Sequence, residues 1–223
     1  MKKDNRSSRK SDKSKSNPKF DWRSIGNPIK PEYKISVKSR DQATESSSEF
    51  EVFIQDLLKT DKATILGITN ERVIGKLNDL THKKYLNQER KEFNFVFLHP
   101  EYLKEVKDQY GDDVDERKKR WKKSIEGAIE LMEKTESKVK IYLNNGVLGF
   151  TFSMFHYDSV AERNQFRLIF NFPHGDYNTN PTFEFQANDG LYEKFESFVF
   201  DMFESMNPYS KTELIDLIGE IEE

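Results

Sequence analysis

Short apolar runs that alternate with amphipathic helical segments constrain this chain more than any other feature. Residues 63–68 (ATILGI) and 93–98 (FNFVFL) are almost entirely apolar, as strands buried on both faces are. Helical periodicity follows each run, and the longest such segment, residues 114–132, has apolar positions three or four apart. Strands that alternate with helices pair in parallel, because a crossover between parallel strands needs a helix-length connection. The sequence therefore predicts an α/β fold whose first strands are parallel.

The pattern changes after Ser137, where strands follow one another without long helices between them. A hairpin signal, Asn144-Asn145-Gly146, separates the first two of these strands, and Pro181 favours a sheet edge for the last. The expected strands cover residues 139–143, 147–154, 165–172 and 181–186. We therefore expect one mixed β-sheet, parallel in its first half and antiparallel in its second half, flanked by helices.

Polar capping residues mark where several helices begin. Ser48 with Glu51 and Ser210 with Glu213 have the spacing of a capping box, and Asp189 stands before an apolar-periodic segment that ends the sheet region. The last helix has an apolar stripe that we expect to pack on the parent sheet, with a second copy or another protein as the alternative.

Aromatic residues recur at every second position in the later strands. This period places them on both faces of the sheet, so we expect helices to cover both faces. The alternative is a stacking surface for nucleic-acid bases, but only Arg163 and Arg167 supply basic charge nearby. Core packing is therefore the favoured interpretation of Phe150, Phe152, Phe155, Phe166, Phe170, Phe172, Phe183 and Phe185.

Charge divides the chain into unequal parts. Residues 1–19 carry a net charge of +6, whereas the whole chain carries −3, so we expect a disordered basic arm before an acidic domain. Such an arm is either a solvated tail or a contact for nucleic-acid phosphates. Residues 20–45 are expected to form an extended linker that docks on the domain of residues 46–223. The candidate phosphate contacts are Lys2, Lys3, Arg6, Arg9 and Lys10.

Composition excludes several classes of protein. The chain has no cysteine, which excludes disulfides, thiolate metal sites and cysteine nucleophiles. It has no apolar run long enough for a membrane span and no secretory signal, so we expect a cytoplasmic protein without membrane contact. No phosphate-binding glycine loop or other cofactor motif is present, and we expect no cofactor and no bound metal.

Several segments resemble the phospholipase D-like domain of bacterial regulators. The matching residues are 63–69, 95–101, 117–132, 139–142 and 191–204. The resemblance implies a mixed α/β sheet. Active members of that family use His-x-Lys-x4-Asp, in which the histidine attacks phosphorus. The nearest string here, His82 to Glu89, ends in glutamate and occurs once, so the resemblance implies a degenerate or absent catalytic motif.

The remaining histidines are the candidate functional residues. His99 ends a buried strand, where open α/β sheets place their ligands, and we count Thr69 and Asn70, after the preceding strand, as candidate ligand-binding residues with it. His156 and His174 end two later strands, each with an aspartate two residues on, Asp158 and Asp176. These strand-end side chains are candidates for binding a ligand, and His99, His156 and His174 are also the candidates for catalysis.

Three functions compete. The leading hypothesis is a non-catalytic regulatory or sensor module of a bacterial cytoplasm, which binds a small ligand or a protein partner and takes part in stress response or phage defence. The first alternative is a phosphodiesterase or nuclease that uses histidines at the strand ends. The second is a nucleic-acid-binding protein that uses the basic arm. A homodimer is compatible with each of these functions.

Overall fold

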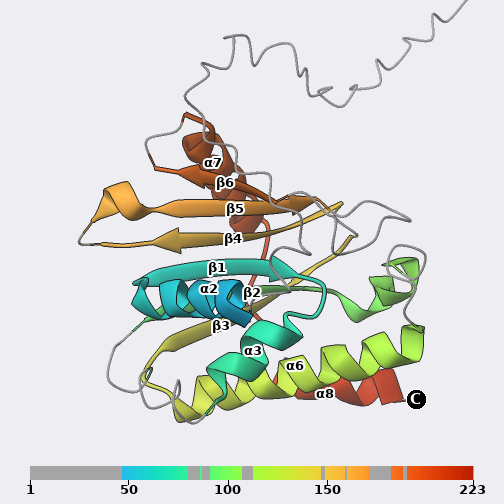
Figure 1. Ribbon diagram of the computed structural model, residues 1–223. Helices are drawn as coiled ribbons and strands as arrows, with labels where there is room; N and C mark the ends of the chain where they lie inside the picture. The colour runs from blue at the N-terminus through green and yellow to red at the C-terminus, as the bar shows by residue number, and fades with distance from the viewer. Residues whose placement is uncertain are drawn as a thin grey trace, which may run out of the picture. The chain divides into compact units, whose positions relative to one another are not determined.

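The computed structural model describes residues 47–79, 86, 91–106, 113–146, 149–158, 160–170, 182–187 and 190–222, all of which belong to the unit Lys34–Glu223 (Figure 1). The expected basic arm and linker, the His82 string, His174 with Asp176, and the cap Asp189 lie outside the described residues.

The described strands form one mixed sheet, which confirms the predicted fold class. Its order is β3-β2-β1-β4-β5-β6; β1, β2 and β3 are parallel, and β4, β5 and β6 continue antiparallel from β1. The short strand β6 lies at the edge, as Pro181 predicted. The bounds are β1 Lys62–Gly67, β2 Glu92–Leu98, β3 Lys138–Asn144, β4 Phe150–His156, β5 Gln165–Phe170 and β6 Thr182–Gln186.

The predicted hairpin between β3 and β4 is wrong. β4 pairs with β1 on the other side of the sheet, while β3 pairs with β2. The outer edge of β3 is also engaged, because the Tyr209 N–H donates to the Ile141 carbonyl at 2.8 Å. With both edges of β3 in contact, Asn144-Asn145-Gly146 begins a crossing connection instead of a tight turn.

One face of the sheet, here called the main face, carries most of the helices. Figure 1 shows α2 in front of the first strands and α6 beside α8 below them. Trp121 is fully buried there, and its indole N–H donates to the Leu98 carbonyl at 2.8 Å. The last helix packs on this face through buried Leu214. The helices are α2 Ser47–Lys59, α3 Glu71–Leu77, the 3₁₀ helix η2 Pro100–Val106, α6 Val114–Lys134 and α8 Lys211–Glu222.

The opposite face, here called the α7 face, is covered by α7 Gly190–Glu204, which lies against β5 and β6 (Figure 1). Phe166 and Phe195 stack with ring centroids 4.6 Å apart. Tyr192 and Val199 are buried against the sheet. Helices therefore lie on both faces, as the alternating aromatic residues predicted.

The start of α8 is the predicted capping box. The Ser210 N–H donates to the Glu213 carboxylate at 2.7 Å, and the Glu213 N–H donates to the Ser210 hydroxyl at 3.3 Å. Helix α2 begins at Ser47, one residue before the cap predicted at Ser48. In the described part of the chain, no helix combines the length and the apolar character that a bilayer crossing requires.

Gly127 sets the distance between α3 and α6. A Cβ at this position would lie 2.7 Å from Ile74 Cγ2 and 2.9 Å from Asn78 Nδ2, and the Asn78 amide donates to the Gly127 carbonyl at 2.8 Å. We predict that Gly127→Ala lowers the free energy of unfolding by about 1–3 kcal/mol, the usual cost of overpacking, measured by urea denaturation.

Gly219 provides the matched control, because it lies in α8 and a Cβ added there would meet no other atom. Gly219→Ala is expected to raise the free energy of unfolding by about 0.5–1 kcal/mol through helix propensity. Equal stability of the two variants would show that α3 and α6 do not need the glycine.

Candidate ligand-binding site

Each parallel strand begins with two polar residues separated by one other residue. Strand pairing aligns these residues in two rows, Lys62–Glu92–Lys138 and Thr64–Asn94–Lys140. Two residues further along, β1 and β2 have the apolar residues Leu66 and Val96, which pack on the α7 face. Because side chains of a strand alternate between faces, both polar rows lie on the α7 face, near the amino ends of the parallel strands.

Strand β4 places His156 beside the amino ends of the parallel strands. It runs antiparallel to β1, so its last residue pairs with Lys62, the first residue of β1. The His156 carbonyl accepts from the Asp61 N–H at 2.9 Å, and the Asp61 carboxylate accepts from the Asp158 N–H at 2.8 Å. These bonds fix the segment that follows β4 beside the polar rows.

A cavity of about 200 Å³, here called the His156 cavity, lies between the polar rows and α7. Its floor comes from β1, β2 and β4, and its wall comes from one side of α7. It is lined by Lys62, Thr64, Asn94, Met154, His156, Asp158, Glu196, Val199, Phe200 and Phe203. The structure thus brings together two residues from the sequence-based candidates, His156 and Asp158.

Asn94 is the most deeply buried polar residue of β2, with 4% of its surface exposed. Its Nδ2 donates a long hydrogen bond of 3.4 Å to the Thr64 hydroxyl. Its Oδ1 has no hydrogen-bond partner among the described residues. A buried polar atom without a partner costs about 1–3 kcal/mol, so Asn94 carries an energetic cost in the fold.

Positive charge predominates on the β2–β3 side of the polar rows. Glu92 lies 3.5 Å from Lys62, 3.3 Å from Lys140 and 3.5 Å from Lys138. Burial alone would raise the pKa of Glu92, but the three ammonium groups outweigh burial and hold this pKa below its ordinary value. One carboxylate therefore neutralises only one of three lysines.

Negative charge predominates on the α7 side. Glu196 accepts from the Tyr192 hydroxyl at 3.5 Å and lies 3.7 Å from His156 Nδ1. Burial lowers the pKa of His156, Lys62 lowers it further, and Asp158 opposes them. The imidazole is therefore neutral at neutral pH. Among the described residues, neither Glu196 nor Asp158 has a lysine or arginine partner in an ion pair.

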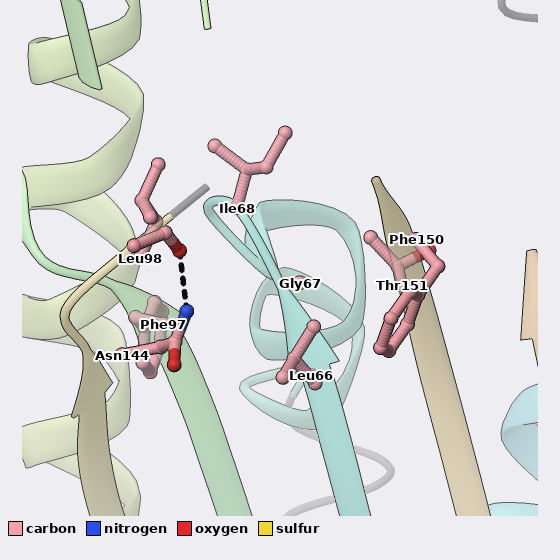
Figure 2. Close-up of a pocket in the computed structure, with 9 residues that line it drawn as sticks. Leu66, Gly67, Ile68, Phe97, Leu98, Asn144, Phe150 and Thr151 are labelled. Atoms are coloured by element: carbon pink, nitrogen blue, oxygen red, sulfur yellow. Dashed lines mark hydrogen bonds between the residues drawn. The ribbon is translucent and has the colours of Figure 1, made fainter. Parts of the chain in front are cut away.

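At the carboxyl ends of the parallel strands, where the sequence placed other candidates, the described residues line a small depression of about 20 Å³ with mostly apolar walls. Figure 2 shows its lining residues around the ends of β1, β2 and β3 and the start of β4. That volume is close to the space needed by one water molecule. Its lining includes Leu66, Phe97, Leu98 and Phe150, but neither His99 nor Asn70.

The sequence-based candidates at this edge have contacts within the fold. Asn70 is in the left-handed conformation with φ of 51° and makes no side-chain cap of α3. Its amide instead donates to the Val96 carbonyl at 3.1 Å, and its Oδ1 occupies the space beside Gly67. The side chain of His99 is 16% exposed beside Glu101. Thr69 lies in the same turn as Asn70.

The two candidate histidines that the structure describes do not meet. His99 follows the carboxyl end of β2, whereas His156 pairs with the first residue of β1. The two histidines therefore lie at opposite ends of the parallel strands. His174 is outside the described residues. Within the described ranges, no group of three histidine or acidic residues has an arrangement that could hold a metal ion.

The residues that β1 and β2 contribute to the floor of the cavity, Lys62, Thr64 and Asn94, were not among the sequence-based candidates. A signal was present, because a polar residue, an apolar residue and a second polar residue open each of β1, β2 and β3 (KAT, EFN and KVK). Glu196 was not a candidate either, since on a helix rich in acidic residues it has no distinguishing pattern. Only the packing of α7 places it in the cavity.

The sequence matches no family model and no curated protein. Among solved structures, one that is similar to this chain is TrmBL2, an archaeal chromatin protein whose structure is described as showing a novel mode of DNA binding. The TM-score is 0.42 at 8% identity, over 81% of this chain and 57% of the other. This chain therefore spans little more than half of that protein, and the likeness is too low to support an argument about function.

The lowered pKa of His156 predicts how stability depends on pH. The unfolded chain, with a histidine pKa near 6.5, binds a proton that the folded chain excludes in the window just below that value. The stability from the neutral imidazole is therefore complete above pH 6.5 and is lost as the pH falls towards the lowered folded-state pKa. We expect the wild type to lose more stability than His156→Gln between about pH 7.5 and pH 5.

Urea denaturation of both proteins across this range measures the effect. The burial of a neutral imidazole would be contradicted in two cases. Either the difference between the two free energies of unfolding stays constant, or the wild type becomes more stable relative to the variant as the pH falls.

Proposed function

We propose that this chain is a binding module for a small polar molecule, which it holds in the His156 cavity. The observation that supports this proposal most strongly is Asn94. Its amide lines the cavity and is almost completely buried, and its Oδ1 has no donor within the described structure. Buried polar atoms in folded proteins usually have partners, and a bound molecule with an N–H or O–H group would supply this one after a rotation that turns the enclosed Oδ1 towards the cavity.

The size of the cavity favours a small ligand. Its volume of about 200 Å³ lies below the roughly 300–1,000 Å³ of sites that hold drug-sized molecules. Charged and polar groups of both signs line it together with apolar side chains, and a few placed polar groups among apolar walls are typical of small-molecule sites.

The position of the cavity also supports the regulatory role expected from the sequence. Glu196, Val199, Phe200 and Phe203 belong to α7, whereas the floor belongs to the sheet. A molecule that contacts both favours the conformation in which α7 is docked, and a ligand shifts an equilibrium by its difference in affinity for the two states. We propose that α7 is the element through which binding is sensed, in a protein of the bacterial cytoplasm. The phospholipase D-like relationship stays a prediction.

Asn94→Leu tests whether the buried Asn94 amide lowers the stability of the ligand-free protein. Leucine is similar in size and removes the unpartnered oxygen, so we expect the free energy of unfolding of the ligand-free protein to rise by about 1 kcal/mol. Urea denaturation measures the change. Thr64→Val is the control, because it keeps Asn94 but removes the acceptor of its Nδ2, and it should lower stability. A less stable Asn94→Leu protein would show that the amide is satisfied in the fold.

Binding itself is tested by saturation-transfer NMR on the full chain with a defined set of probes: glycine, γ-aminobutyrate, putrescine, acetate, adenosine and glucose. We expect at least one probe to bind the wild type and to lose its signal with both Asn94→Leu and Val199→Trp, because the first variant removes the acceptor and the second fills the cavity. Absence of binding by every probe, or equal binding to all three proteins, would overturn the proposal.

A further inference from the structure

We infer that the molecule held in the His156 cavity is a small zwitterion, with one ammonium group and one carboxylate group as in an amino acid. This inference rests on the proposed function and adds the class of ligand. It is derived from the charges that line the cavity: Lys62, which belongs to the lysine cluster around Glu92, and the carboxylates of Glu196 and Asp158, which have no lysine or arginine partner among the described residues.

The acceptor side suits an ammonium group. Glu196 and Asp158 line the cavity, and no lysine or arginine of the described residues pairs with either of them. His156, whose Nδ1 lies 3.7 Å from Glu196, has a pKa lowered by burial, so the neutral imidazole does not compensate the carboxylate charge. An ammonium group has three N–H donors, which these two carboxylates can accept.

The opposite side suits a carboxylate group. Lys62 lines the cavity and lies 3.5 Å from Glu92, as an ion pair without a hydrogen bond. Glu92 is already hydrogen-bonded to Lys140 at 3.3 Å and is also paired with Lys138. Three ammonium groups surround one carboxylate, which leaves an excess of positive charge. A second carboxylate beside Lys62 therefore pairs with this excess charge and need not displace Glu92.

Lys62 does not pair with the carboxylates that line the cavity among the described residues. Lys62 and Glu196 line the same cavity, yet no ion pair joins them in the described part of the chain. A simple amine would face the lysine cluster, and a simple carboxylate would face Glu196 and Asp158, so each meets repulsion from one side. A molecule with both charges meets attraction on both sides. Met154, Val199 and Phe203 supply apolar contact for its carbon atoms.

The test measures binding of matched probes to the full chain by isothermal titration calorimetry. The zwitterions are glycine, β-alanine, γ-aminobutyrate, leucine and phenylalanine. For each, one analogue lacks the negative charge (the amide) and another lacks the amino group (the simple acid). We expect at least one zwitterion to bind about ten- to a hundred-fold more tightly than both of its analogues, since each charged hydrogen bond contributes about 1.5–3 kcal/mol.

Two variants assign the charges to their residues. Lys62→Met should weaken binding of that zwitterion about tenfold or more but should not weaken binding of its amide analogue, from which it removes a repulsion. Glu196→Gln should likewise weaken the zwitterion but not the simple acid. Lys134→Met and Glu193→Gln are the control variants with the same charge changes, because Lys134 pairs with Glu130 on α6 and Glu193 belongs to the same helix as Glu196, but neither lines the cavity. Both controls should bind as the wild type does.

The outcomes separate the two proposals. If adenosine, glucose, acetate or putrescine binds in an Asn94-dependent manner and no zwitterion does, the inference is wrong and the proposed function stands. If a zwitterion binds but the charge variants and their controls behave alike, the inference is also wrong. If none of the probes binds, both proposals fall.

Discussion

The antiparallel pairing of β4 with β1 determines where the candidate site lies. Because β4 runs opposite to β1, the last residue of β4 lies beside the first residue of β1. His156 is thereby set beside Lys62, and the bonds of Asp61 to the His156 carbonyl and the Asp158 N–H hold the following segment in place. If β4 had instead paired with β3, as a hairpin, the lining of the cavity would have been dispersed over the sheet.

The α7 face combines two kinds of surface in a single layer. Towards β5 and β6 it is an aromatic core, with Phe166 between Phe152 and Phe195 at centroid distances of 5.3 and 4.6 Å. Towards the amino ends of β1–β3 it is polar, with Asn94 and Thr64 buried. The aromatic part anchors α7, and burial of large apolar side chains supplies the stabilisation. That stabilisation offsets the cost of the buried polar groups, which a core made only for stability would lack.

Much of the fold was predictable because it depends on local patterns. Apolar runs gave β1 and β2, the periodicity of residues 114–132 gave α6, and Ser210 with Glu213 gave the start of α8, which reciprocal hydrogen bonds confirm. The hairpin failed because a turn signal reports only local backbone preference, whereas the partner of a strand depends on which edges are already paired. Asn70, a candidate ligand-binding residue, donates its side-chain amide to the Val96 carbonyl, a partner distant in sequence that no local pattern indicates.

By itself, the sequence determined the class of the fold, since hydrophobic periodicity decides which segments are helices and which are buried strands. It also contained the polar residues at the start of each parallel strand, in the strings KAT, EFN and KVK. Only the tertiary structure decided that these residues align in two rows, that His156 joins them, and that Glu196 faces them from α7. The physical reason is that register and strand order arise from contacts between segments far apart in the chain, and a separation of charge across a cavity exists only once those segments have packed together.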